Sequence, residues 1–279
     1  MKRREFTDYL KNNGFSYDEA VSEVDFAIEI LTSFSPSDFI KNIELSDNEY
    51  NIVRYAIKQR VLTKKPIQQI VGQAFFMGNR YFVNEYTLIP RPESEIIIEE
   101  CFKKIAGKSN GRVLDIGTGS GCLAIEIARN PAAQDIFAVD ICKNALDIAQ
   151  KNAVYHNVGH KIKFIHSDLF SKIDEKFDII VSNPPYIPLK EKQGLQPEVR
   201  DFEPEGALFT IDDEGVEFYE KIIMQSAGYL NRGGFIIFEL GINQSDIVKK
   251  LFEKNGFKNI EIIKDLNLID RIIIAQIKS

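Results

Sequence analysis

The sequence predicts an α/β protein with a doubly wound, mostly parallel sheet, an antiparallel last strand and a small N-terminal helical bundle. Three observations predict this fold. Short apolar runs alternate with helix-period segments from residue 93 onward, which is typical of a parallel sheet with helices on both faces. Residues 1–65 carry helical periodicity alone. The last two expected strands, 260–263 and 271–277, are joined by a connection too short for a crossover, so the final strand should run antiparallel.

Residues 1–65 are interpreted as a helical bundle. Apolar positions with helical spacing occur in 6–10 and 21–31, and 51–62 is expected to form a third helix. Ser46–Glu49 precedes that third helix, with Ser or Asp expected to cap it. The segment is too short for a catalytic domain. We expect it to dock a substrate, and a purely stabilising role is the alternative.

Residues 66–92 are expected to form a β-hairpin linker. Gln73–Met77 and Tyr81–Val83 flank a predicted three-residue turn, Gly78–Arg80. Arg91 lies between two prolines in a stiff, extended segment. Its guanidinium could bridge the linker to a core carboxylate or contact a substrate, and we favour a structural or substrate-orienting role over catalysis.

The domain 93–279 has polar motifs after four successive predicted strands. The carboxyl ends of parallel strands meet at one edge of a sheet, where open α/β proteins bind ligands. In chain order, the strands are 112–116, 135–140, 161–166 and 177–182, and the motifs are Gly117-Thr118-Gly119-Ser120-Gly121, Asp140, Asp168 and Asn183-Pro184-Pro185-Tyr186.

The glycine-rich loop indicates close approach of the backbone to a ligand, and the helix that follows it offers unpaired N–H groups. Its G-x-G-x-G spacing is neither the dinucleotide fingerprint nor a phosphate-binding P-loop. Asp140 follows at about 20 residues, the spacing of a ligand to ribose hydroxyls. Asp140 and Asp168 could each instead cap a helix.

Asn183 and the two prolines after it cannot continue a strand, because proline lacks an N–H and fixes φ. The resulting elbow should project the Asn183 oxygen and nearby carbonyls into the crevice. Two adjacent acceptors suit a planar NH2 group, either a carboxamide or an exocyclic amine.

The rest of the chain is expected to complete the sheet. Residues 187–212 are expected to form a long polar loop that is either disordered or a functional lid, and its position beside the elbow favours a lid. A helix over 214–230, a strand over 234–240 and a helix over 245–255 should follow, the last capped by Ser245 and closed by Gly256.

Composition predicts a cytoplasmic enzyme without a metal. The chain has 279 residues and a net charge of −6, with no signal peptide pattern and no apolar run long enough for a membrane span. The cysteines lack C-x-x-C spacing, which favours a reducing compartment. The histidines fall on a helix, a loop and a strand, where they are not expected to share a metal. These residues are Cys101, Cys122, Cys142, His156, His160 and His166.

The motifs resemble those of S-adenosylmethionine-dependent class I methyltransferases that modify amide or exocyclic amino nitrogens. The residues that carry this resemblance are Asp115–Gly121, Asp140, Asp168 and Asn183–Tyr186. Two further stretches, Leu88–Glu95 and Val199–Pro204, are similar to the PrmC/HemK family, which methylates the glutamine of the Gly-Gly-Gln motif in class 1 peptide chain release factors. The resemblance runs from about residue 67 to the C-terminus, with Ser94 where many relatives have Thr.

The resemblance implies S-adenosylmethionine as the methyl donor and a release factor as the protein substrate. It implies donor binding by Gly117, Thr118, Gly119, Ser120, Gly121, Asp140, Asp168 and Asn183, catalysis by Asn183, Pro184 and Tyr186, and substrate contacts from these three, Pro185 and Arg91. Asn183 Oδ1 and the Pro184 carbonyl would accept the two amide hydrogens, and Tyr186 would wall the pocket.

Other classes remain alternatives. A glutamine methyltransferase of a ribosomal protein would share the same motifs. An adenine-N6 nucleic-acid methyltransferase would share the elbow, but the negative net charge argues against a long nucleic acid as partner. A dehydrogenase-type nucleotide binder would need a later glycine in the loop. We expect a monomer that binds neither nucleic acid nor membrane.

Overall fold

The computed structural model describes residues 2–35, 38, 44–106 and 111–278. Contacts divide the chain into two units: residues 1–74 with 196–202, and residues 75–195 with 203–279. The sequence pattern places the boundaries at 65 and 92 instead, and it does not indicate that 196–202 packs with the N-terminal helices.

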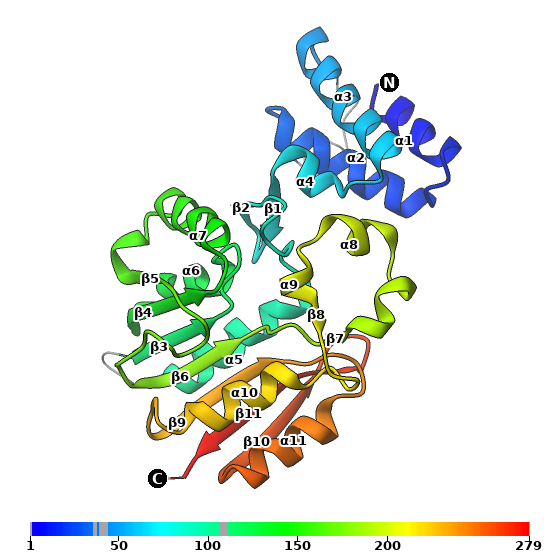
Figure 1. The fold of residues 1–279 in the computed structure, drawn as a ribbon. Coiled ribbons are helices and arrows are strands. Elements are labelled where there is room, and N and C mark those ends of the chain that lie inside the picture. Colours follow the sequence, from blue (N-terminus) through cyan, green and yellow to red (C-terminus); the bar gives the residue numbers. More distant parts are fainter. Residues whose placement is uncertain (1, 36–37, 39–43, 107–110, 279) are drawn as a thin grey trace. The chain divides into compact units, whose positions relative to one another are not determined.

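The first unit is helical and has its own core. Its helices are α1 (Lys2–Asn12), α2 (Tyr17–Leu31), α3 (Asp47–Thr63), α4 (Ile67–Val71) and α8 (Pro197–Phe202) (Figure 1). Leu10, Ile28 and Ile57 are among the buried apolar residues of this core. Ser46 Oγ accepts from the Glu49 N–H, and the Glu49 carboxylate accepts from the Ser46 N–H, which confirms the expected cap of α3.

Arg60 links α8 to the helices that come before it in this unit. The side chain, on α3, is buried, and its guanidinium lies 2.9 Å from a carboxylate oxygen of Glu23 and 3.1 Å from one of Glu198. Gln69 adds a hydrogen bond of 3.0 Å from its side-chain amide to the backbone oxygen of Phe202.

The second unit is built on a seven-stranded sheet. Its strands are β3 (Gly111–Ile116), β4 (Ala133–Asp140), β5 (Ile162–His166), β6 (Phe177–Ser182), β9 (Leu230–Glu239), β10 (Phe257–Lys264) and β11 (Asp270–Ile277). Across the sheet, the order is β10-β11-β9-β6-β3-β4-β5 (Figure 1). β11 runs antiparallel to both neighbours and every other pair is parallel, which confirms the predicted fold class.

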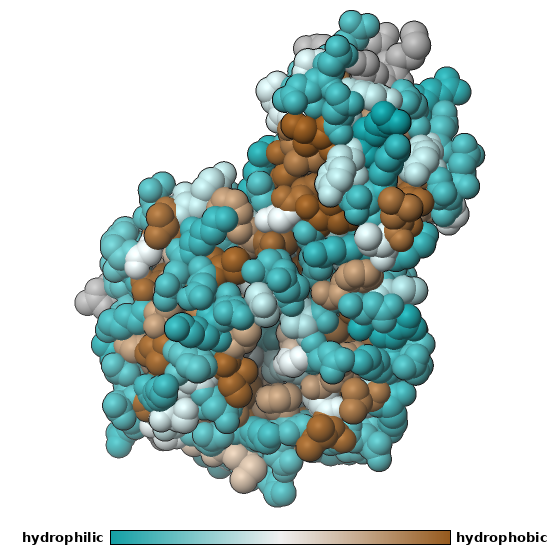
Figure 2. All heavy atoms as spheres, turned by 45° about the horizontal axis from the view of Figure 1, so that its top comes forward, coloured by the Kyte–Doolittle hydropathy of each residue, from teal (hydrophilic) through white to brown (hydrophobic). Residues whose placement is uncertain are grey.

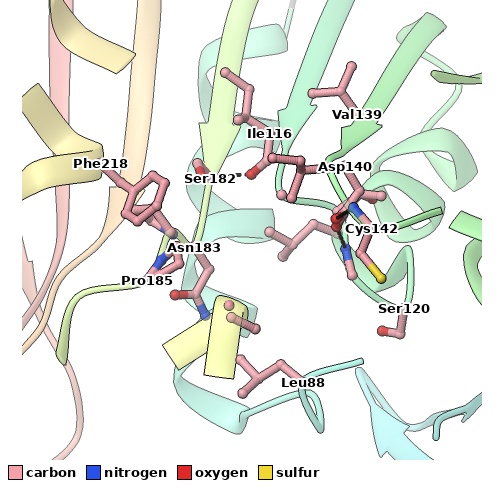
Figure 3. Close-up of a pocket in the computed structure, with 18 of the residues that line it drawn as sticks. Leu88, Ile116, Ser120, Val139, Asp140, Cys142, Ser182, Asn183, Pro185 and Phe218 are labelled. Atoms are coloured by element: carbon pink, nitrogen blue, oxygen red, sulfur yellow. Dashed lines mark hydrogen bonds between the residues drawn. The ribbon is translucent and has the colours of Figure 1, made fainter. Parts of the chain in front are cut away.

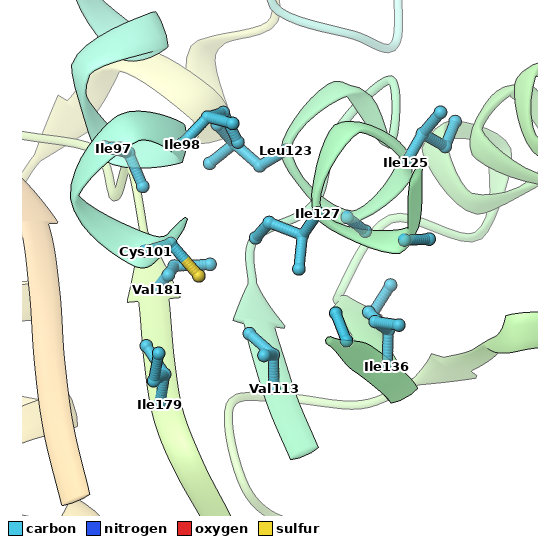
Figure 4. Packing of buried hydrophobic residues seen from close by; sticks show 14 of the residues in the cluster. Ile97, Ile98, Cys101, Val113, Leu123, Ile125, Ile127, Ile136, Ile179 and Val181 are labelled. Carbon is cyan, nitrogen blue, oxygen red and sulfur yellow. The ribbon is translucent and has the colours of Figure 1, made fainter. Parts of the chain in front are cut away.

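Helices cover both faces of this sheet. On one face lie α5 (Glu95–Ile105), α6 (Cys122–Arg129) and α7 (Lys143–Tyr155), and on the other lie α10 (Glu217–Ser226) and α11 (Ser245–Lys254). Figure 4 shows the first of these layers, where Ile97 and Ile127 face Val113 and Ile179 of the strands. The progression of strands reverses between β3 and β6, and such a reversal leaves a crevice at the carboxyl ends.

The predicted hairpin is present, but the prediction placed its turn at the wrong residues. β1 (Gln73–Phe76) and β2 (Asn79–Phe82) are joined by two residues, Met77 and Gly78, with φ of 50° and 70°. Positive φ at both positions is the geometry of a tight two-residue hairpin turn. Asn79 and Arg80, expected in the turn, therefore begin β2.

The long loop expected over 187–212 is largely structured. β7 (Ile187–Pro188) pairs with β8 (Phe209–Thr210), and between them lie the 3-10 helix η4 (Leu189–Gly194), α8 and α9 (Glu205–Leu208). Further short 3-10 helices, η2 (Pro92–Ser94) and η3 (Gly159–Lys161), precede α5 and β5.

Other boundaries differ from the sequence-based expectations. α10 starts after residue 214, because the Asp212 carboxylate accepts the N–H groups of Val216 and Glu217. Leu230 begins β9 instead of ending the helix. Gln244, and not Ser245, is the N-cap of α11, since the Ser245 hydroxyl donates to Asp270 at 2.7 Å.

The surface carries both polar and apolar side chains. The face drawn in Figure 2 is mostly hydrophilic, with apolar side chains in small groups among polar ones. On α3 the exposed apolar side chains include Ile52, Tyr55 and Leu62. No helix within the described ranges is both long and apolar enough to span a bilayer.

Candidate active site

A cavity of about 450 Å³ lies at the carboxyl ends of β3, β4, β5 and β6 (Figure 3). This volume is in the range of small-molecule sites, about 300–1,000 Å³. The predicted site residues that line it are Arg91, Gly117, Thr118, Gly119, Ser120, Asp140, Asp168, Asn183, Pro184 and Pro185. Two predicted site residues, Gly121 and Tyr186, are not among the lining residues. Motifs that are distant in sequence thus meet at one sheet edge.

The glycines of the loop after β3 serve two different purposes. Gly119 has a φ of 55°, and a Cβ placed on it would meet no atom within 4 Å, so this position combines a left-handed backbone with open space. Gly121 has a φ of 80°, and a Cβ there would lie 2.9 Å from the Cβ of Ala149 on α7. Gly121 is therefore required by helix packing, and Gly119 leaves room for a ligand near the backbone.

Asp140, at the end of β4, is held by two backbone groups. Its Oδ2 accepts from the Gly119 N–H at 2.9 Å, and its Oδ1 accepts from the Cys142 N–H at 2.8 Å. Burial raises the pKa of Asp140, and these N–H groups, with the charge of His166, oppose the rise. Each carboxylate oxygen retains a lone pair for a further donor, as a ligand hydroxyl would require.

Asp115 is a buried acid beneath the loop that sequence reasoning did not select as a site residue. The Thr118 hydroxyl donates to its Oδ2 at 2.6 Å, and no described residue hydrogen-bonds its Oδ1. Burial raises the pKa of Asp115 to about 7, against the hydrogen bond from Thr118. An acid in this position is partly protonated near neutral pH.

The elbow after β6 holds Asn183 in a defined orientation. Asn183 Nδ2 donates to Ser94 Oγ at 3.1 Å, and the Ser94 hydroxyl donates to the Glu239 carboxylate. Just before the elbow, the Ser182 hydroxyl donates to the Ile116 carbonyl at 2.7 Å, which joins the ends of β6 and β3 (Figure 3). Tyr186 points its hydroxyl at Glu239, with a separation of 3.3 Å.

Arg91 is paired with a buried carboxylate. Its guanidinium donates to Glu203, which is almost fully buried, and Glu203 also accepts from the Ile89 N–H at 3.4 Å. Burial raises the pKa of Glu203, and the charge of Arg91 opposes the rise. The pairing fits the structural role favoured for Arg91, and Arg91 also lines the cavity.

Several lining or supporting residues escaped the sequence analysis. Apolar side chains that form part of the wall include Leu169, Phe218 and Ile222, and nothing distinguishes them in sequence from core residues. Glu239 carried a usable signal, because it is a charged residue directly after the apolar run Phe235–Phe238, at the carboxyl end of β9. Ser94 was noted only as a serine where many relatives have Thr, within the stretch Leu88–Glu95.

Two of the three histidines contact backbone carbonyl groups. His156 Nε2 lies 2.8 Å from the Arg80 carbonyl oxygen, and His166 Nε2 lies 2.9 Å from that of Ile141. Across the described part of the chain, no group of three or more His, Cys, Asp or Glu side chains is arranged to hold a metal ion.

Known proteins resemble this chain over most of its length. The family model for the methyltransferase small domain matches residues 93–199. A release factor glutamine methyltransferase from Fusobacterium nucleatum is 34% identical over 271 residues, which is 96% of this chain and 76% of that protein. One from Flavobacterium psychrophilum is 40% identical over 244 residues, with coverage of 86% and 83%.

Solved structures share the fold. A methyltransferase from Pyrococcus furiosus has a TM-score of 0.56 against this chain at 19% identity, covering 80% of this chain and 98% of that one. Similarity at that level of identity concerns the architecture alone.

Proposed function

We propose that this chain, which belongs to the family of release factor glutamine methyltransferases, transfers a methyl group from S-adenosylmethionine to the side-chain amide nitrogen of a glutamine in a class 1 release factor. The observation that carries the proposal is the held amide of Asn183. Its NH2 is engaged by Ser94, and no described residue hydrogen-bonds its Oδ1. A free carbonyl oxygen on the cavity wall can accept from a planar NH2 group.

The cavity fits the proposed donor. A nucleoside needs a flat, mostly apolar slot with acceptors for its ribose hydroxyls, and the wall combines Ile141 and Leu169 with Asp140. The open space at Gly119 lets a polar tail approach the loop backbone. We assign Asp140 to the ribose hydroxyls, and the loop 117–121 with Asp168 and Asn183 to the remainder of the donor.

The substrate amide is a weak nucleophile because its nitrogen lone pair is delocalised into the carbonyl. When bound, the donor supplies an electrophilic methyl group. The protein's task is to orient the amide, and orientation can lower a barrier by several kcal/mol, up to ~7–11 in well-held systems. Asn183 Oδ1 and the Pro184 carbonyl would accept the two N–H groups. Both bonds strengthen as the nitrogen gains positive charge, which stabilises the transition state selectively.

The N-terminal bundle is proposed to dock the release factor. Ile52, Tyr55 and Leu62 of α3 are 40%, 65% and 73% exposed, and their spacing places them along one side of the helix. An exposed apolar stripe on a small helical unit is suited to contact with a protein surface.

A methylation assay with labelled donor tests the function. The substrates are an intact release factor, the same factor with its Gly-Gly-Gln glutamine replaced by glutamate, a short Gly-Gly-Gln peptide, ribosomal proteins and duplex DNA. We expect the intact factor to be methylated far better than the peptide, and mass spectrometry to place the methyl group on the glutamine. Preferential methylation of a ribosomal protein would reassign the substrate, and methylation of DNA would overturn the amide assignment.

A further inference from the structure

A chain of hydrogen bonds runs from Asn183 to a buried carboxylate outside the cavity wall. Asn183 Nδ2 donates to Ser94 Oγ, and Ser94 donates in turn to Glu239 Oε2. The hydroxyl of Tyr186 donates to the other oxygen, Oε1. Glu239 is 1% exposed and is the last residue of β9, one position beyond Phe238, which pairs with Ser182 of β6. The strand register therefore places this carboxylate beside the elbow.

The number of hydrogens available in this series of hydrogen bonds fixes which group donates and which accepts at each step. Ser94 has one hydroxyl hydrogen, and it is committed to Glu239, so the serine oxygen can only accept from Asn183. The group that faces Ser94 must then be the NH2 of Asn183, and its Oδ1 must point elsewhere. The two ends of an amide have nearly the same shape, so packing alone does not choose between them.

We propose that Glu239 and Ser94 are positioning residues that set the direction of the Asn183 amide, so that Oδ1 and not NH2 meets the substrate amide. The inference rests on the proposed function, in which Asn183 Oδ1 accepts a substrate N–H. A reversed amide would place donors of Asn183 against donors of the substrate, and no hydrogen bond would form. Glu239 and Ser94 act through Asn183.

The charge of Glu239 is essential to this arrangement. As an anion it only accepts, so Ser94 and Tyr186 must both donate to it. A protonated Glu239 could donate to Ser94, whose hydrogen would then turn to Asn183 Oδ1 and reverse the amide. The groups facing Glu239 are Ser94, Tyr186, Arg271, Glu93 and Tyr219, whose hydroxyl donates to the Glu239 backbone oxygen at 2.9 Å.

These surroundings give the pH dependence a direction. Burial raises the pKa of Glu239, with Glu93 adding to the rise, and Ser94, Arg271 and Tyr186 oppose it. Turnover should therefore fall on the acid side as Glu239 takes up its proton, at a pH above the ordinary range for glutamate. A variant that cannot titrate at this position should lose the part of the acid limb of the pH–rate profile that Glu239 contributes, whereas contributions from Asp140 and Glu203, whose pKa values burial also raises, would remain.

The test uses variants that change which groups donate in the hydrogen-bond series from Asn183 to Glu239, with little change in side-chain shape. Ser94→Ala removes the acceptor for the Asn183 NH2, and kcat on the intact release factor should fall about two- to tenfold, the range of one hydrogen bond. Ser94→Thr retains the hydroxyl and should restore most of the rate. Glu239→Gln can donate to Ser94 and should lower kcat at least about tenfold. Donor affinity should change much less than kcat in all three, because the donor contacts proposed for Asp140 and the loop 117–121 do not depend on the direction of the Asn183 amide.

A matched control separates positioning from general loss of stability. Glu126 is also a buried carboxylate, it accepts from the Tyr81 hydroxyl, and it is not part of the cavity wall. Glu126→Gln should leave kcat and its acid limb unchanged. If Glu239→Gln fails to fold, the Ser94→Ala and Ser94→Thr pair decides alone.

A double-mutant cycle separates this inference from the proposed function. If Ser94 acts only through Asn183, Ser94→Ala should cost little in an Asn183→Ala background. Three results would overturn the inference and leave the proposed function standing. They are additive losses of kcat in the cycle, a loss in Ser94→Thr as large as that in Ser94→Ala, and an acid limb of the pH–rate profile that is unchanged in Glu239→Gln. If Asn183→Ala alone keeps more than half of the wild-type kcat, the role of Asn183 fails, and the inference with it.

Discussion

Replacing Asp140 by alanine should weaken S-adenosylmethionine binding about ten- to a hundredfold. Both oxygens of Asp140 accept backbone N–H groups, at 2.9 Å from Gly119 and 2.8 Å from Cys142, which aim the carboxylate and leave a lone pair on each oxygen. A hydrogen bond to a charged acceptor contributes about 1.5–3 kcal/mol. That range corresponds to about ten- to a hundredfold in the dissociation constant.

Calorimetric titration with the donor measures this directly, and titration with NAD tests the alternative ligand. Asp135→Ala is a suitable control, because Asp135 lies on the same strand, pairs with Arg112 at 2.8 Å and does not line the cavity. The control should bind the donor as the wild type does. Unchanged donor affinity in Asp140→Ala, or tight NAD binding by the wild type, would refute the assignment of this site.

Three further changes have defined outcomes. Asn183→Ala should lower single-turnover rates by ~10²–10³ with a much smaller effect on donor affinity, because Asp140 and the loop 117–121 leave most of the donor pocket intact; weaker donor binding with normal turnover would contradict this. Burial raises the pKa of Asp115 from 3.8 to about 7, so the folded protein keeps this proton where the unfolded chain has lost it. The contribution of Asp115 to the free energy of unfolding should therefore fall by roughly 4 kcal/mol as the pH rises from ~4 to ~7. Urea unfolding of Asp115→Asn should lack this pH-dependent contribution. Arg60→Leu leaves the carboxylates of Glu23 and Glu198 without their buried partner and should destabilise the first unit by about 3–5 kcal/mol; an unfolding curve like that of the exposed control Arg4→Leu would contradict this.

The sheet and its functional edge were predictable because their signals are local. An apolar run followed by a glycine loop, an acid or an Asn-Pro pair is read from a few adjacent residues. Parallel topology then brings the strand ends together without further information. Asp140 and Asn183 therefore line the same cavity, as the sequence predicts for a shared sheet edge.

Features that depend on long-range register were not predictable in the same way. Glu239 supports Asn183 only because β9 pairs with β6, and a strand displaced by one residue would turn that carboxylate to the other face. The start of α10 depends on Asp212, whose carboxylate accepts two N–H groups of the first turn. Tyr186 was expected in the cavity wall; it is not among the residues that line the cavity, and its hydroxyl donates to Glu239.

The segment 196–202 shows why docking and stabilisation are not exclusive roles for the bundle. Arg60 and Gln69 hold this segment in the first unit through Glu198 and the Phe202 carbonyl. Removing residues 1–65 would take Arg60 away from Glu198, and so would disturb the packing of 196–202 as well as remove the exposed stripe of α3. Loss of activity in such a truncation would therefore not distinguish a lost docking surface from a disturbed first unit. Substitutions confined to the exposed stripe of α3 would distinguish them.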